Sequence, residues 1–216
     1  MNTLPLEFSS WANELAKYSR IIWEKGFAEA NGGNLSVKIS EDLMMTTPTM
    51  MSKGELTSND MVICNLKGDI VFGNHSPSSE IYSHLAIYNA NENAMAIVHS
   101  HPPYSSSYAY TEDMPFKSLS AETVLWIGDI CVIPFVTPGS IELSKEIERL
   151  CKGKHVLLLR NHGLITWGEN LQEAIWRTEI MERNCKISHL ITARGALPSK
   201  LTNRQIGILE KLKGGL

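Results

Sequence analysis

The sequence predicts an α/β fold: a single domain in which a central mixed, largely antiparallel sheet is flanked by helices. Stretches with apolar residues at helical spacing alternate along the chain with short apolar or alternating stretches typical of strands. No internal repeat, low-complexity tract or long linker interrupts this alternation, so we expect one domain over residues 1–216. At 43% hydrophobic and 20% charged residues, the chain can bury a full core.

The elements follow from this periodicity in chain order. Residues 8–25 carry apolar side chains three or four positions apart, which predicts a helix that Ser9 or Ser10 can cap. The first half then continues with expected strands at 35–39, 61–64 and 70–72, a helix opening at 77–80, a strand at 94–99 and a short helix at 105–110. The second half has expected strands at 130–136 and 156–159, helices at 142–150 and 171–193, and a weaker helix at 203–212.

Charge and composition exclude several classes of function. Twenty Lys and Arg against 23 Asp and Glu give a net charge of -3, and no basic run marks a nucleic-acid site. The start has no basic segment followed by an apolar one, and apolar runs stay far below the roughly 18 residues of a membrane span. We therefore expect a cytoplasmic protein, without membrane or nucleic-acid partners, whose four widely spaced cysteines are reduced.

Three histidines suggest a metal site. His99 and His101 stand one residue apart at the end of an apolar strand, so both imidazoles can point to one side, and His162 follows the strand at 156–159. Three imidazoles, with coordination positions left open for a substrate, suit zinc or a similar ion. The alternative is chance, because an isolated HxH pair has about even odds of having no metal-binding role. His84, four residues after Glu80, is an alternative ligand; packing or support of another ligand is favoured.

Other segments have polar groups suited to anions, although each is by itself an ordinary turn or cap. Ser78 and Ser79 stand where a helix begins, so hydroxyls and unpaired backbone N–H groups converge there. The segments 31–34 and 46–49 combine glycine, asparagine, threonine and proline, which suits tight backbone approach.

Taken in order, five motifs resemble the class II aldolase and adducin family, and most closely its L-fuculose-1-phosphate aldolase branch. They are GGNLS at 32–36, TPT at 47–49, PSSE at 77–80, HSH at 99–101 and NHG at 161–163. The resemblance covers about residues 10–195. It implies a mixed sheet flanked by helices, and a homotetramer with four-fold symmetry whose active sites lie between neighbouring subunits.

The resemblance also assigns roles to residues. It implies that His99, His101 and His162 bind Zn²⁺, or another divalent ion such as Mn²⁺ or Co²⁺, and that Glu80 is both ligand and acid/base. The implied reaction cleaves a ketose 1-phosphate, L-fuculose 1-phosphate or similar, to dihydroxyacetone phosphate and an aldehyde such as lactaldehyde. The implied contacts of the substrate phosphate are Asn34, Thr49, Ser78 and Ser79.

The chain departs from the aldolase branch in places. The segment 117–121 lacks the tyrosine that this branch borrows from a neighbouring subunit, and residues 211–216 lack a second one. Met50 replaces the glycine that usually follows TPT, which can narrow the phosphate loop. Glu122, near the catalytic glutamate of the methylthioribulose-phosphate dehydratase branch, is a candidate replacement for the tyrosine; the alternative is a surface residue capping the next segment.

Other reactions of the family remain alternatives. Ribulose-phosphate 4-epimerases usually have Asp where Glu80 stands, decarboxylases tend to have Lys at the position of Ser79, and dehydratases generally lack the carboxylate of the PSSE motif. Glu80 after two serines therefore favours the aldolase. A non-enzymatic, adducin-like binding module is disfavoured because all four ligand positions are filled.

Overall fold

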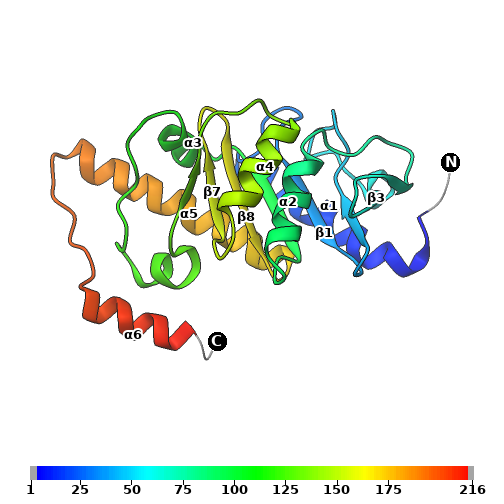
Figure 1. Ribbon diagram of the computed structural model, residues 1–216. Helices are drawn as coiled ribbons and strands as arrows, with labels where there is room; N and C mark the ends of the chain where they lie inside the picture. Colours follow the sequence, from blue (N-terminus) through cyan, green and yellow to red (C-terminus); the bar gives the residue numbers. More distant parts are fainter. Residues whose placement is uncertain (1–3, 214–216) are drawn as a thin grey trace.

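An eight-stranded sheet runs through residues 4–213, the part of the chain that the computed structural model describes (Figure 1). All neighbouring strands pair antiparallel except β6 and β7, which are parallel. This confirms the mixed, largely antiparallel sheet. In order across the sheet the strands are β4 (Ile70–Phe72), β3 (Val62–Asn65), β2 (Leu43–Thr46), β1 (Asn34–Lys38), β5 (Ala96–Ser100), β8 (Gly163–Gly168), β7 (Val156–Leu159) and β6 (Cys131–Ile133).

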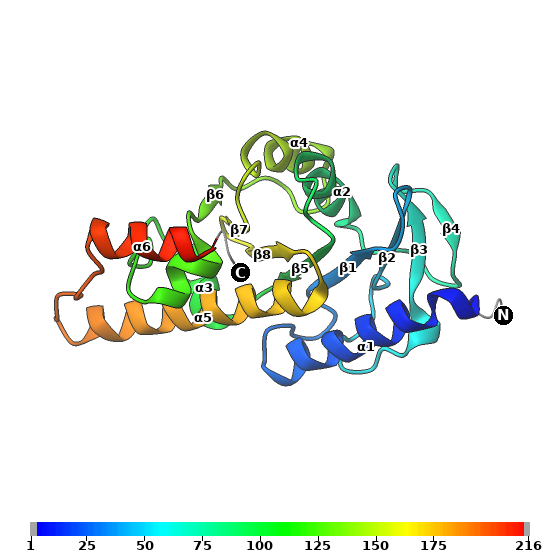
Figure 2. The same cartoon turned by 90° about the horizontal axis from the view of Figure 1, so that it is seen from below.

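Helices cover both faces of the sheet. Seen from below, α2 and α4 lie on one face, and α1 and α5 lie on the other (Figure 2). The C-terminal α6 stands apart from the sheet and contacts the π-helical turn Thr123–Ile127. The helices are α1 (Ser9–Glu24), α2 (Ile81–Ala90), α3 (Pro103–Ala109), α4 (Ile141–Leu150), α5 (Leu171–Ala193) and α6 (Asn203–Lys213), with short 3-10 turns at Leu6–Phe8 and Ser58–Asp60.

The central strand β5 contributes to a core on each face. Because side chains alternate along a strand, Ile97 belongs to the apolar cluster beneath α2 and α4, whereas Ala96 and Val98 belong to the cluster beneath α1. His99 continues the alternation, so its ring lies on the same face as Ile97 and α2. All five residues of β5 are buried, which explains why its sequence is apolar on both faces until the polar end.

Most predicted elements are confirmed, but the prediction lacks the 3-10 turns at Leu6–Phe8 and Ser58–Asp60 and opens α2 at 77–80, whereas the helix begins at Ile81. The strands β2 and β8 and the π-helical turn are missing from the prediction, and β6 is shorter than the predicted strand at 130–136. Strand β2 contains two methionines, which have no strong strand preference, so its pattern is weak. The predicted serine cap of α1 is wrong: its N-cap position is Phe8, and the Ser9 hydroxyl donates to the Leu6 carbonyl at 2.7 Å.

The segment after the HSH motif is fixed by a buried carboxylate. Glu182 on α5 accepts hydrogen bonds from the backbone N–H groups of Tyr104 and Ser105, at 2.9 and 2.7 Å, and from the Ser105 hydroxyl at 2.8 Å. These N–H groups belong to the first turn of α3, where helical partners are missing. Glu182 thereby ties the chain that leaves His101 to the long helix behind the sheet.

No helix in the described part of the chain is long and apolar enough to cross a membrane. Residues 1–3 and 214–216 lie outside the described part. The predicted domain, residues 1–216, therefore begins before the described part and ends after it. The last three residues of the segment 211–216, which lacks a tyrosine, also lie outside the described part.

Candidate metal centre

His99 lies buried at the bottom of the site. It lies in β5 directly opposite Asn34 of β1, and only 1% of the residue is exposed. Its Nδ1 lies 3.0 Å from the carbonyl oxygen of Leu164 on β8, the neighbouring strand on the other side. A carbonyl only accepts hydrogen bonds, so Nδ1 carries a proton and Nε2 points away from the strand toward α2.

His101 reaches the same place from outside the sheet. The prediction that both histidines lie on the strand is corrected here, because β5 ends at Ser100. The His101 backbone N–H donates to the Phe27 carbonyl at 2.7 Å, and its Nδ1 lies 2.8 Å from a carboxylate oxygen of Glu29. Gly163 permits this position, since a Cβ there would lie 2.5 Å from the His101 ring.

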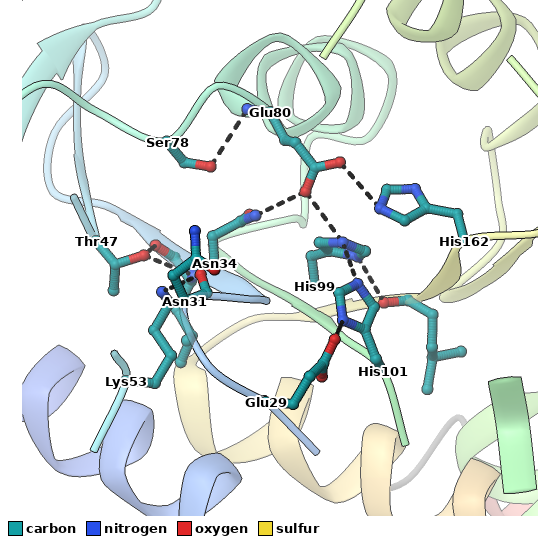
Figure 3. A network of polar contacts seen from close by, with 12 residues as sticks. Glu29, Asn31, Asn34, Thr47, Lys53, Ser78, Glu80, His99, His101 and His162 are labelled. Atoms are coloured by element: carbon teal, nitrogen blue, oxygen red, sulfur yellow. Dashed lines mark hydrogen bonds and ion pairs between the residues drawn. The ribbon is translucent and has the colours of Figure 1, made fainter. Parts of the chain in front are cut away.

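His162 completes the cluster from the turn between β7 and β8. The preceding residue, Asn161, has a φ of 54°, a left-handed conformation that asparagine tolerates better than most residues. The His162 ring centre lies 4.7 Å from that of His99 and 5.5 Å from that of His101. One ring nitrogen from each of the three residues lies within 4.8 Å of the others, an arrangement able to hold a metal ion (Figure 3).

The donor atoms fit a cation. The Nε2 atoms of His99 and His101 lie 3.2 Å apart, although the Nδ1 of each faces a hydrogen-bond acceptor. Two neutral rings with protonated Nδ1 would bring lone pairs together there, so a proton or a metal ion must lie between them. Burial works to lower the pKa of His99, but the charge of Glu80 and the hydrogen bonds to it and to Leu164 outweigh burial and raise this pKa.

The other two histidines are held neutral. Burial, followed by the charge of His99, lowers the pKa of His101, and the same two causes lower the pKa of His162 to about 4. Neutral imidazole is the form that binds metal. Both rings are therefore in the metal-binding protonation state at neutral pH.

Glu80 joins the cluster from the start of α2. Its Oε2 lies 3.0 Å from the Nε2 of His99 and accepts a 2.8 Å hydrogen bond from the side-chain amide of Asn34, and its Oε1 lies 3.3 Å from the Nε2 of His162. Burial works to raise the pKa of Glu80, but these neighbours hold it well below its usual range. Glu80 is thus a carboxylate at neutral pH that faces the Nε2 atoms of His99 and His162.

His84 lies outside the cluster. It is 1% exposed, and its Nδ1 hydrogen-bonds the Ser36 hydroxyl at 2.7 Å, which also contacts the Tyr88 hydroxyl at 2.7 Å. These contacts connect α2 to β1 just below Glu80 and Asn34. The geometry favours packing and support over direct ligation for His84.

A pocket of about 240 Å³ opens beside the cluster. It gathers seven of the sequence-predicted site residues from distant parts of the chain, while His99 lies beneath it. Ser78 is 7% exposed and its hydroxyl accepts from the Glu80 N–H at 3.2 Å. The seven are Asn34, Thr49, Ser78, Ser79, Glu80, His101 and His162.

Glu122 lies elsewhere in the chain. It precedes the π-helical turn and lines a separate pocket of about 190 Å³ against α5, together with Arg183 and Asn184. The structure of one chain therefore does not bring Glu122 to the histidine cluster, and its role stays a prediction.

Sequence reasoning missed two residues of the site, Glu29 and Lys53. Glu29 lies in the loop after α1 and contacts His101, and Lys53 follows the TPT motif and lines the pocket. A charged residue near a glycine-rich loop was the only available signal, and many surface residues share it. Met50 adopts a φ of 59°, so a side chain does occupy a conformation that favours glycine, as its position after TPT suggested.

Comparison with known proteins connects this geometry to a family. Residues 13–189 match the class II aldolase and adducin N-terminal domain. The chain belongs to this family. The match covers most of the chain and includes the histidine cluster, Glu80 and the pocket.

Class II aldolase relatives with different activities resemble the chain to a similar degree. An L-fuculose phosphate aldolase of Methanococcus maripaludis is 29% identical over 82% of the chain and 96% of its own length. A 3-oxo-tetronate 4-phosphate decarboxylase of Haemophilus influenzae is 30% identical over 91% of the chain and 94% of its own length. A solved structure of an L-fuculose 1-phosphate aldolase superimposes with a TM-score of 0.84 at 30% identity, covering 98% of both chains.

Replacing Glu29 by alanine is expected to weaken metal binding about 10- to 100-fold, the usual effect of losing a carboxylate that orients a histidine ligand. The Glu29 contact holds His101 with its proton on Nδ1 and its Nε2 free. Titration of the metal-free protein with Zn²⁺ against a chromophoric chelator measures the affinity. Glu24→Ala, which removes an exposed carboxylate from the end of α1, is the matched control, and equal affinities of the two variants would rule out this role.

Proposed function

We propose that the chain is a metal-dependent class II aldolase that cleaves a ketose 1-phosphate, L-fuculose 1-phosphate or similar, to dihydroxyacetone phosphate and an aldehyde such as lactaldehyde. The observation that carries the proposal is the position of Glu80. Its carboxylate contacts two histidines of the cluster and also borders the pocket beside them. Glu80 can therefore act both as a metal ligand and as an acid/base group, beside the pocket in which we expect the substrate to bind.

The residues divide the work between them. We assign His99, His101, His162 and Glu80 as ligands of Zn²⁺ or another divalent ion such as Mn²⁺ or Co²⁺. When bound at these residues, such an ion would supply Lewis-acid stabilisation of the charge left on the substrate when the C3–C4 bond breaks. Glu80, ionised at neutral pH and facing the pocket, can accept the proton that the C4 hydroxyl loses as the aldehyde forms and return it to the carbon next to the ketone.

The polar part of the pocket fits the phosphate. Thr49, Ser78 and Ser79 line it from two loops, and Asn34, whose side-chain amide donates to Glu80, also borders it. Hydroxyl and backbone N–H groups around a loop and a helix start are suited to an anion. We assign these four residues to the substrate phosphate.

A 3-oxo acid decarboxylase is the second candidate. The H. influenzae decarboxylase is 30% identical over nearly the full chain, and residues 117–121 contain no tyrosine. The two reactions share their critical step: losing CO2 from a 3-oxo acid, like losing an aldehyde, leaves charge on the carbon beside the ketone, which must then gain a proton. Ser79, where decarboxylases tend to have lysine, favours the aldolase.

Other family reactions are less well supported. A glutamate at position 80 disfavours ribulose-phosphate 4-epimerase and methylthioribulose-phosphate dehydratase activity, and the filled ligand set disfavours an adducin-like binding module.

We further propose a cytoplasmic homotetramer with active sites at subunit interfaces. In such an assembly Glu122 can act on the substrate of a neighbouring subunit, which is testable by the native mass and by mixing Glu122 and Glu80 variants.

Incubating the Zn²⁺-loaded protein with a series of ketose 1-phosphates is expected to release dihydroxyacetone phosphate from at least one of them. A coupled assay with glycerol-3-phosphate dehydrogenase detects this product. Decarboxylation of 3-oxo-tetronate 4-phosphate leaves the same three-carbon phosphate, so CO2 must be measured in parallel. Release of CO2 without cleavage of any ketose 1-phosphate would replace the aldolase by the decarboxylase, and turnover of ribulose 5-phosphate alone would indicate the epimerase.

A further inference from the structure

Lys53 is a buried lysine in the wall of the pocket. Only 1% of the residue is exposed, and its Nζ donates to the backbone carbonyls of Met51 at 2.8 Å and Asn31 at 3.2 Å. No carboxylate among residues 4–213 forms a salt bridge with it. Figure 3 places Lys53 on the far side of Asn34 from the histidine cluster.

A buried ammonium group without a counter-charge is costly, so its presence requires an explanation. Burial lowers the pKa of Lys53 to about 8, which still leaves most of the group protonated at neutral pH. The two carbonyls satisfy two of the three N–H donors of an ammonium group. One donor and a whole positive charge remain for a further partner.

The pocket is where that partner would sit. Of its lining residues, Lys53 is the one lysine or arginine; apart from Glu80 and the two histidines His101 and His162, the other polar side chains of the lining are neutral amides and hydroxyls. The two carbonyls that it contacts belong to the loop before β1 and the loop after TPT, which border the pocket together. A charge held rigidly between two loops loses little freedom when an anion arrives, which favours binding.

We propose that Lys53 is the electrostatic anchor of the substrate phosphate and makes the enzyme select phosphorylated over unphosphorylated sugars. This inference rests on the proposed function, because it places the phosphate at the Lys53 end of the pocket and the ketone at the histidine end. The hydroxyl and amide donors orient the phosphate, and Lys53 supplies the charge that neutral donors lack.

Lys53→Met, which keeps the length of the side chain and removes its charge, tests the inference. The variant is expected to bind inorganic phosphate about 10- to 100-fold more weakly than the parent protein, in calorimetric titrations of the Zn²⁺-loaded protein. The kcat/KM for a ketose 1-phosphate should fall similarly, through KM, and by much more than the kcat/KM for the unphosphorylated ketose. Lys145→Met, on the exposed side of α4, is the matched control.

A purely structural role predicts other results. If Lys53 only joins the two loops, Lys53→Met lowers the thermal midpoint and reduces turnover of both sugars equally, which would overturn the inference. Lys53→Arg keeps the charge, so it should retain phosphate binding even if Lys53→Met folds poorly; equal loss in both variants also contradicts the anchor. Phosphate binding that depends on Lys53 in a protein that cleaves no ketose 1-phosphate would retain the anchor and reject the aldolase.

Discussion

His99→Ala is expected to abolish stoichiometric metal binding and to lower kcat/KM for carbon–carbon cleavage by about a thousandfold or more. His99 contacts both Glu80 and His101 through Nε2, and it is the most deeply buried of the three histidines. Its alanine variant leaves a gap at the base of the site that neither of the other two rings can reach. His101 and His162 alone would provide too few ligands to retain the ion.

Elemental analysis of the purified variant after loading with Zn²⁺ measures this loss, and the coupled assay measures turnover. His189→Ala removes a histidine from the exposed side of α5 and should leave metal content unchanged. Comparing thermal midpoints of the metal-free proteins separates a ligand effect from a folding effect, because the metal contributes nothing there. A variant that binds one equivalent of zinc as tightly as the parent would refute the metal centre.

The sheet was predictable wherever burial leaves a periodic signal. Strands β5 and β7 are apolar on both faces, and α1 has one apolar stripe, so each could be placed within a few residues. Strand β8 was missed although all six of its residues are buried, because a short apolar run directly after a turn resembles a continuation of the preceding loop. Pairing with β5 and β7, which local sequence does not encode, makes it a strand.

The metal cluster was predictable for a different reason. Histidines that follow apolar strands were a visible signal, but they meet because β5 and β7 both run antiparallel to β8 between them, which brings their carboxyl ends to the same edge of the sheet. Glu29 and Lys53 differ, since each acquires its role from one contact with a residue far away in the sequence: His101 for Glu29, and the Asn31 carbonyl for Lys53. Such contacts depend on loop conformation, which periodicity does not report.

The reaction itself was less accessible than the site. Relatives named as an aldolase and as a decarboxylase are similarly related to the chain, at 29% and 30% identity. Both reactions leave the same kind of charge on the carbon beside a ketone, so one kind of site suits both. What separates them is the group that leaves. The structure of one chain places Glu122, the predicted candidate for acting on that group, away from the cluster, so its role stays a prediction about the proposed assembly.

Glu80→Gln is expected to lower kcat for cleavage by about a hundred- to ten-thousandfold, the usual contribution of a positioned acid/base group, while zinc remains bound with reduced affinity. The amide has almost the same shape as the carboxylate, and its oxygen can still accept from Asn34 and face the cluster. It cannot take up a proton at neutral pH. Glu148→Gln on the exposed side of α4 makes the same chemical change away from the site and serves as the control.

Measuring metal affinity and kcat on the same Glu80→Gln sample distinguishes the two roles of the carboxylate. If the residue acts mainly as a ligand, activity returns when zinc is raised to saturate the weakened site, because the lost function is occupancy. If it transfers the proton, saturation restores the metal and leaves kcat low. Because Glu80 remains ionised beside two histidines and also borders the pocket, we expect kcat to stay low at saturating zinc. Full activity at saturating zinc would assign proton transfer to another group.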